Sequence, residues 1–295
     1  MEPDLLMEMQ YPYWHISRIA PSVIMAFCFL LGIPGNLAVV VVVVRNMERG
    51  NFTLRLMLNL AFCDLLVLLC LPLVIYNLQT NWELGPELCK TLFLLLHGGL
   101  NASVLTITLL SVQRYIQVLY PQNWARLGRL GEEALLLFLW GLAGLIAFPS
   151  IFVKKVSTSG HLGSCASCYP SKDVEMSVLL FQTVVGFLMP CCILGTSYFF
   201  LHRRVSLASQ LRQQRLTKLV SSIMVSFFSC WAPLHLFNLL AVVNVVLENK
   251  ELERVCEIAW DFLIACSTFN SCLNPFLYAF ASSGFRRDHP QPTST

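Results

Sequence analysis

Seven separate apolar segments constrain this chain more than any other feature. A transmembrane helix needs about 20 mostly apolar residues, and only a helix satisfies its own backbone hydrogen bonds in lipid. The shorter alternating segments typical of a barrel strand are missing. We therefore predict an all-α membrane protein with a seven-transmembrane helix bundle at 19–281, between an N-terminal segment 1–18 and a tail 282–295. The predicted spans are 19–45, 54–78, 87–119, 133–153, 175–202, 215–247 and 255–281.

The composition favours the same class and excludes others. Of the 295 residues, 56% are hydrophobic and 13% are charged, whereas soluble domains carry about 25% charged residues. The net charge is only +3, and no Lys/Arg-rich stripe with interleaved aromatic residues occurs, so we predict no nucleic-acid partner. The 12 cysteines form no paired CxxC motifs, and no HExxH is present, so a structural or catalytic metal site is not predicted.

The basic residues predict the orientation. If the N-terminus lies outside, 13 of the 20 Lys and Arg residues fall on the cytoplasmic side, and 12 of the 17 acidic residues fall on the outer side. Cytoplasmic loops of membrane proteins carry the excess of Lys and Arg. We therefore expect an N-terminus outside, a C-terminus in the cytoplasm, and a multi-pass protein of the plasma membrane surrounded by membrane lipids.

One acidic residue, Asp64, lies in the middle of a predicted span. A charge inside the bilayer is costly and is functional by default. A carboxylate among several oxygen donors indicates a site for a hard cation, here an allosteric Na⁺; the alternative is a protonated or hydrogen-bonded structural aspartate. An intramembrane enzyme needs paired catalytic groups, so we predict no enzyme. The polar residues at a similar depth are Ser103, Asn270, Ser271 and Asn274.

Short motifs recur in order along the chain. They are Gly35-Asn36, Asn59-Leu60-Ala61 with Asp64, Gln113-Arg114-Tyr115, Trp140, Pro190 with Tyr198, Cys230-Trp231-Ala232-Pro233 and Asn274-Pro275-Phe276-Leu277-Tyr278. Together they resemble the rhodopsin-like (class A) G-protein-coupled receptors over nearly the whole chain. The resemblance implies a heterotrimeric G protein as partner. It also implies roles in activation and G-protein coupling for Gln113, Arg114, Tyr115, Tyr198, Trp231, Pro233, Asn274, Pro275 and Tyr278.

The same resemblance implies a disulfide bond between Cys89 and a cysteine of the second outer loop. Cys165 and Cys168 both lie in that loop, and the outer face of a cell is oxidising enough for either bond. We prefer Cys165, which leaves Cys168 as a free thiol. Arrestin binding is expected to be weak, because the tail offers few hydroxyl groups for phosphorylation.

Within this superfamily the chain resembles the leukotriene B4 receptors, especially the second, lower-affinity subtype. The stretches that carry this likeness are 111–114, 165–171, 216–221 and 231–240. The likeness implies an acidic lipid ligand (leukotriene B4 or a related hydroxy fatty acid), a G protein of the inhibitory type, and chemotaxis. The expected ligand contacts are His97, Lys154, Gln182, Trp231, His235, Asn238 and Trp260.

Two positions depart from that pattern. Those receptors carry a Glu where this chain has Gln182, and the first subtype carries an Arg where this chain has Trp260. The alternative ligand is a chemoattractant peptide. Acidic residues on the outer side would suit a basic peptide, namely Glu248, Glu251, Glu253, Glu257 and Asp261.

Overall fold

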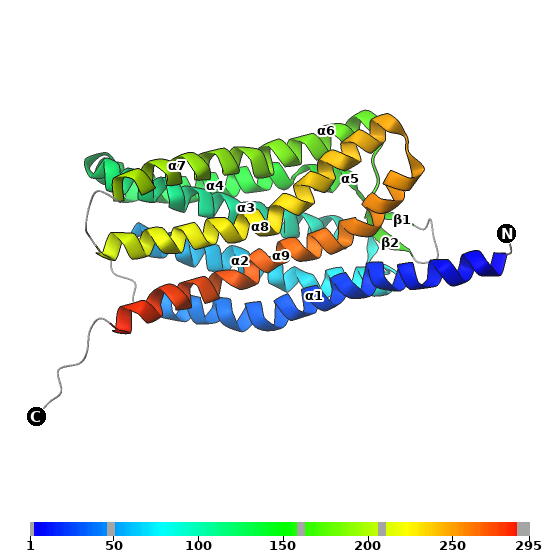
Figure 1. The fold of residues 1–295 in the computed structure, drawn as a ribbon, viewed down its shortest axis with the longest axis horizontal. Coiled ribbons are helices and arrows are strands. Elements are labelled where there is room, and N and C mark those ends of the chain that lie inside the picture. Colours follow the sequence, from blue (N-terminus) through cyan, green and yellow to red (C-terminus); the bar gives the residue numbers. More distant parts are fainter. Residues whose placement is uncertain (1–2, 46–50, 158–162, 206–210, 288–295) are drawn as a thin grey trace, which may run out of the picture.

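Long helices and one short hairpin make up the structure, a computed structural model that describes residues 3–45, 51–157, 163–205 and 211–287 (Figure 1). Six helical segments are long and apolar enough to cross a membrane, and α9 adds a seventh. The predicted seven-helix bundle is confirmed; its orientation stays a prediction. The helices are α1 (Pro3–Arg45), α2 (Phe52–Gln79), α3 (Gly85–Leu119), α4 (Pro121–Ala147), α5 (Pro149–Val153), α6 (Lys172–Thr183), the π-helix η1 (Val184–Leu188), α7 (Met189–Val205), α8 (Leu211–Leu247) and α9 (Lys250–Arg287).

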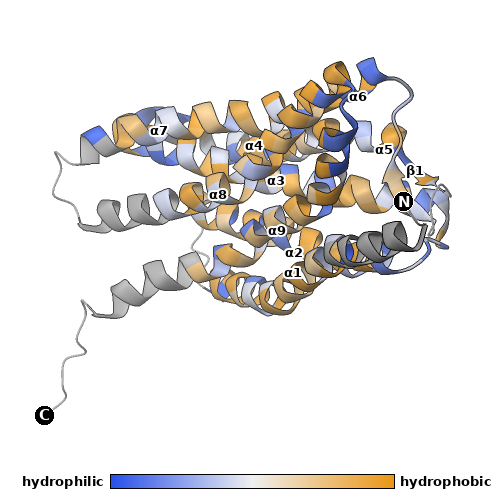
Figure 2. Cartoon of the chain, turned by 45° about the vertical axis from the view of Figure 1, so that its right-hand side comes forward, coloured by the Kyte–Doolittle hydropathy of each residue, from blue (hydrophilic) through white to orange (hydrophobic). Residues whose placement is uncertain are grey.

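Hydrophobic residues predominate along the helices of the bundle (Figure 2), and many of their large side chains are exposed. A soluble protein rarely exposes apolar patches of this extent, so these side chains face lipid. Among the large side chains that stay exposed are Leu30, Leu69, Leu137, Leu145, Val225 and Leu236.

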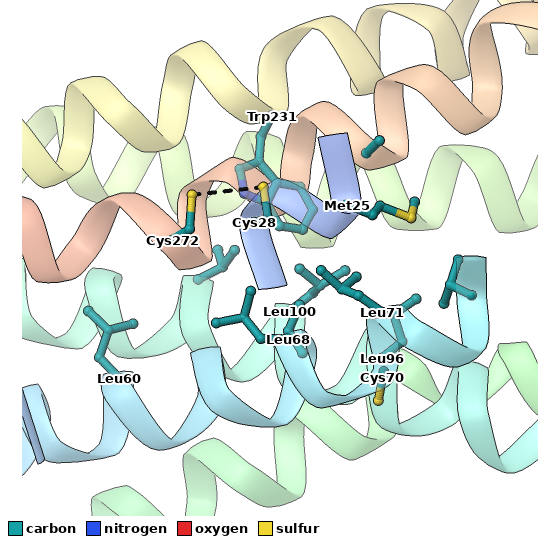
Figure 3. Packing of buried hydrophobic residues seen from close by; sticks show 14 of the residues in the cluster. Met25, Cys28, Leu60, Leu68, Cys70, Leu71, Leu96, Leu100, Trp231 and Cys272 are labelled. Atoms are coloured by element: carbon teal, nitrogen blue, oxygen red, sulfur yellow. Dashed lines mark hydrogen bonds between the residues drawn. The ribbon is translucent and has the colours of Figure 1, made fainter. Parts of the chain in front are cut away.

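The core joins α1 and α9 closely (Figure 3). Cys28 and Cys272 are buried, and their sulfur atoms lie 3.8 Å apart. Gly32 makes this approach possible, because a Cβ atom there would lie 2.6 Å from Leu68 Cδ1 and 3.1 Å from the Cys272 Cβ. Trp231 of α8 lies beside this cluster, so the helix that carries it packs directly on the α1–α9 core.

The helices extend beyond several predicted spans. α4 begins at Pro121 rather than at 133, with Gly128 at φ 63° and ψ 179° interrupting it, and α9 continues to Arg287 rather than ending at 281. α1 begins at Pro3, inside the segment assigned to the N-terminus. Hydropathy predicts only the part of a helix that lies in lipid. The helix itself can continue into water, because its backbone hydrogen bonds do not depend on lipid.

Proline distorts the fifth span in a specific way. Pro190 has no N–H to give to the carbonyl of residue 186, and the chain before it forms η1, in which the Met189 N–H bonds to the Val184 carbonyl. A π-turn of this kind inserts one extra residue and shifts the register of the side chains. In this register the Phe187 ring packs against Phe227 and His235 of α8.

A two-stranded antiparallel sheet lies at the end of the bundle near the N-terminus (Figure 1). It pairs β1 (Lys154–Ser157) with β2 (Ser164–Ser167). The register sets Lys154 opposite Ser167 and Val156 opposite Cys165. This hairpin positions Lys154 over the helices, as described below.

Candidate functional site

Asp64 is fully buried in the middle of the bundle. Ser103 Oγ donates to its Oδ1 at 3.1 Å, and Asn274 Nδ2 donates to its Oδ2 at 2.7 Å. Three helices, α2, α3 and α9, therefore meet at one carboxylate. The structure brings together these residues as the sequence suggested, with Asn270 and Ser271 buried on the same helix as Asn274.

Two buried oxygens on α9, the helix that brings Asn274 to this carboxylate, have no partner. Across the described residues, Asn270 Oδ1 and Asn274 Oδ1 are buried without a hydrogen bond, while the Ser271 hydroxyl interacts with the Asp64 carboxyl group. An unsatisfied buried oxygen is costly, and neutral oxygen donors beside a carboxylate are the ligands that a hard cation takes. The residues present thus fit a sodium ion.

Motif residues of the first, second and fourth spans form hydrogen bonds between helices. Asn36 Nδ2 donates to the Gly32 and Ser271 carbonyls, each at 3.0 Å. Trp140 Nε1 donates to Asn59 Oδ1 at 2.9 Å, while Asn59 Nδ2 donates to Thr106 Oγ1 at 2.8 Å. These bonds hold the helices in register around Asp64.

At the opposite end of the bundle from the hairpin, Gln113 and Arg114 close α3. Gln113 is buried and its Nε2 donates to Thr53 Oγ1 at 3.0 Å. Arg114 and Tyr115 are half-buried, and the Tyr115 ring centroid lies 6.1 Å from that of Phe200. Pro233 is inside α8 and Pro275 inside α9. Tyr198 is half-buried on α7, whereas the side chain of Tyr278 lies outside the described residues.

Sequence reasoning missed an ion pair at this end. Arg55 of α2 pairs with Glu132 of α4, and Trp124 Nε1 donates to the same carboxylate at 3.3 Å. The Arg55 guanidinium also lies 5.2 Å from the centroid of the Phe52 ring. The sequence does place oppositely charged residues at the ends of two predicted spans. Their pairing could not be predicted, because it depends on α4 already being helical from Pro121.

The predicted disulfide is confirmed between Cys89 and Cys165, whose Cα atoms lie 5.7 Å apart. Cys168 is a free thiol. Asn77 supports the bond, because its Oδ1 accepts from the Cys165 N–H at 2.7 Å and its Nδ2 donates to the Cys165 carbonyl at 3.2 Å. The sequence gave no sign of this role for Asn77, which depends on a contact between distant parts of the chain.

A deep pocket opens between the helices under the hairpin. Its cavity volume is about 80 Å³, and it continues into an outer pocket of about 350 Å³ that shares Phe93, Lys154 and Trp260 with it. All seven residues expected to contact the ligand line the deep pocket: His97, Lys154, Gln182, Trp231, His235, Asn238 and Trp260.

Lys154 is the one charged side chain among the described residues that line the deep pocket. It is only 7% exposed, and its Nζ lies 3.9 Å from the centroid of the Phe93 ring. Burial lowers the pKa of its ammonium group to about 8, against the opposing field of the Asp261 carboxylate. The neighbouring Lys155 is exposed and faces away from this pocket.

Histidines lie on the wall and at the floor of the deep pocket. His97 Nδ1 lies 2.8 Å from the Phe93 carbonyl and 3.0 Å from Ser150 Oγ. With Nδ1 protonated for that carbonyl, Nε2 is left as an acceptor. The His235 ring stacks between Phe187 and Trp231, at centroid distances of 4.8 Å and 5.8 Å.

The outer pocket has charges of both signs. Arg18 and Lys154 line it together with Glu175 and Asp261. Arg18 is anchored by a hydrogen bond from its Nη1 to the Leu78 carbonyl at 2.9 Å. Lys154 therefore lines the outer pocket together with two carboxylates, those of Glu175 and Asp261.

Comparison with known proteins identifies this arrangement. Residues 35–278 match the family described as 7 transmembrane receptor (rhodopsin family). The chain belongs to this receptor family. The receptor is thus a multi-pass protein of the plasma membrane, in a family of receptors that couple to heterotrimeric G proteins rather than of enzymes.

The receptor is similar to angiotensin II receptors and to a chemokine receptor. It is 31% identical to the type-1 angiotensin II receptor of Bos taurus over 88% of this chain and 76% of that protein. It is 28% identical to the type-2 angiotensin II receptor of Meriones unguiculatus, over 92% and 78% of the two chains. It is 29% identical to atypical chemokine receptor 3 of Canis lupus familiaris, over 90% and 76%. The likeness to leukotriene B4 receptors stays a prediction.

Proposed function

We propose that this receptor binds an acidic lipid mediator, leukotriene B4 or a related hydroxy fatty acid, and activates a heterotrimeric G protein of the inhibitory type. One observation carries the proposal: the single charged side chain lining the described part of the deep pocket is the cation Lys154. A narrow apolar pocket with one buried cation suits a ligand with one carboxylate and a long apolar chain.

In this pose the ligand carboxylate meets Lys154 beneath the hairpin. The chain then passes His97 and Gln182 toward Trp231 at the floor of the pocket. Burial on the Phe93 ring leaves Lys154 poorly hydrated, so a carboxylate that reaches it loses little to competition with water.

Binding studies on the receptor in nanodiscs test this pose. Replacing Lys154 with Gln should lower affinity for leukotriene B4 about ten- to a hundredfold, because a charge-assisted bond is worth about 1.5–3 kcal/mol. The methyl ester should lose a similar amount on the unchanged receptor. Lys155→Gln is the matched control and should change affinity less than threefold. Equal loss in both variants, or a fully potent ester, contradicts the pose.

The alternative ligand is a chemoattractant peptide with a basic side chain. It is favoured by Glu175 and Asp261 in the outer pocket and by the angiotensin and chemokine receptors among the relatives. A panel of radiolabelled lipids and peptides, competed on the same membranes, separates the two. Loss of binding in Asp261→Asn with retention in Lys154→Gln supports the peptide.

For activation we propose that ligand contact at Trp231 biases the kink at Pro233 and so moves the far end of α8. Arg114, with Tyr115, Tyr198 and Tyr278, then takes part in coupling to the G protein. A sodium ion held by Asp64 and Ser103, with Asn270, Ser271 and Asn274, would favour the inactive packing, since its charge satisfies the buried carboxylate. This link between ion and ligand is tested in the Discussion.

A further inference from the structure

Three buried polar atoms at the floor of the deep pocket lack a partner. Across the described residues, Trp231 Nε1, His235 Nε2 and Asn238 Oδ1 make no hydrogen bond. The exposed fractions of His235 and Asn238 are 4% and 2%. The three residues are spaced four and three apart on α8, so they share one helix face, and all three line the pocket.

Thr183 lies beside two of these residues. Its Oγ1 lies 3.5 Å from both His235 Nδ1 and Asn238 Nδ2. Asn238 Nδ2 can only donate, so the Thr183 hydroxyl accepts there, whereas it can either donate to His235 Nδ1 or accept from it. The floor therefore has one fixed donor, Trp231 Nε1–H, and one fixed acceptor, Asn238 Oδ1. His235 Nε2 donates in one tautomer and accepts in the other.

We propose that the floor of the deep pocket, formed by Trp231, His235 and Asn238, is a subsite for an uncharged hydroxyl group of the ligand. A hydroxyl group both accepts and donates hydrogen bonds, so it can accept from Trp231 Nε1–H and donate to Asn238 Oδ1. The inference deepens the proposed function: it makes the ligand a hydroxylated acid whose hydroxyl lies at the inner end of the pocket, with its carboxylate at Lys154.

Other polar groups match the floor less well. A carboxylate has no proton for Asn238 Oδ1, and an ammonium group has no acceptor for Trp231 Nε1–H. Phe187 and Trp231 both stack on the His235 ring, so polar groups meet that ring at its edge. An apolar chain end would leave all three atoms unsatisfied, at a cost for each.

The test compares ligands that differ by one hydroxyl. On the receptor in nanodiscs, affinities are measured for arachidonic acid and for its monohydroxy derivatives with the hydroxyl at successive carbons. We expect at least one positional isomer to bind about tenfold more tightly than arachidonic acid. This advantage should fall below threefold in His235→Phe, which keeps the stacked ring, and in Asn238→Leu. In each variant the affinity for the hydroxylated isomer should fall by a larger factor than the affinity for arachidonic acid.

Asn244→Leu is the matched control. It makes the same change on the same helix, at a residue whose Oδ1 is also unpartnered within the described part of the chain and which lines neither the deep nor the outer pocket. It should keep the tenfold advantage. An advantage that survives in both His235→Phe and Asn238→Leu overturns the subsite, as does the lack of any advantage on the unchanged receptor.

The subsite can fail separately from the proposed function. Lys154→Gln should weaken arachidonic acid and its hydroxy derivatives by the same factor, so it tests the carboxylate alone. If no acid binds, 1-dodecanol is compared with its methyl ether, which cannot donate to Asn238. Thermal stabilisation by the alcohol alone, lost in His235→Phe but kept in Asn244→Leu, supports the subsite without the acid. Equal effects of alcohol and ether overturn it.

Discussion

The carboxamide of Gln113 faces the hydroxyl of Thr53, with Nε2 at 3.0 Å and Oε1 at 3.3 Å from Oγ1. Its neighbour Arg114 therefore has beside it a neutral side chain that is engaged with α2, rather than an acid. This relationship joins the ends of α2 and α3 without adding a negative charge to restrain the arginine.

We predict measurable signalling without agonist, lowered by Gln113→Asp. A carboxylate beside Arg114 adds a partly exposed ion pair worth about 1 kcal/mol, which changes a minor population roughly fivefold. Basal nucleotide exchange on purified receptor with a G protein measures this signalling without agonist. Gln113→Asn shortens the side chain without charge and is the control; equal exchange in both variants means that the missing acid is unimportant. Adding Gln213→Glu, outside the residues whose side chains are described, should lower exchange further.

Agonist affinity should depend on sodium. The ion and the agonist favour different packings, so each lowers the affinity for the other, and a coupling of about 1–2 kcal/mol gives roughly a five- to thirtyfold change. Agonist competition in sodium chloride is compared with N-methylglucamine chloride. In Asp64→Asn the difference should vanish, and a silent response in both the natural receptor and this variant would falsify the sodium site.

Binding of an acidic ligand should weaken as pH rises through about 8. The pKa of Lys154 is lowered to about 8, so its ammonium group is charged below that pH and loses its proton above it. Between about pH 7 and pH 9 affinity should fall roughly tenfold, because the fraction of Lys154 that carries its proton falls about tenfold over this range when the pKa is about 8. In Lys154→Arg the charge persists throughout, and the affinity should be flat over the same range. A fall of equal size in Lys154→Arg would assign the titration to another group.

The pair formed by Arg55 and Glu132 should stabilise the receptor. Their side chains are 21% and 11% exposed, so Arg55→Met leaves a largely buried carboxylate with Trp124 as its one remaining side-chain donor among the described residues. We expect a loss of about 1–3 kcal/mol, seen as a lower midpoint in thermal unfolding. Arg129→Met is the control, because its pair with Glu133 is 84% and 47% exposed and such pairs contribute little. Equal midpoints in the two variants would show that burial adds nothing here.

Much of the candidate site was accessible before the fold was known. Asp64 stood out because a carboxylate in a bilayer needs partners. The family resemblance paired Cys89 with a cysteine of the second outer loop, and the structure decided between Cys165 and Cys168. Asn77 and Thr183 did not stand out, since an amide or hydroxyl in an apolar run gives no sign of which distant backbone or side chain it bonds. The start of α4 at Pro121 was missed because polar residues obscure a helix that leaves the membrane.

By itself, the sequence determined the number of spans, the all-helical class and the receptor family. A backbone that crosses lipid must satisfy its own hydrogen bonds, so each span is a helix that appears in the sequence as a long apolar segment. Only the tertiary structure decided that Lys154 points into the deep pocket while Lys155 points out. A strand sends successive side chains to opposite faces, and which face covers the pocket depends on the hairpin register set by Cys165 and Asn77. The tertiary structure likewise decided which atoms of His235 and Asn238 lack a hydrogen bond, because Thr183 lies beside the other polar atoms of these two side chains.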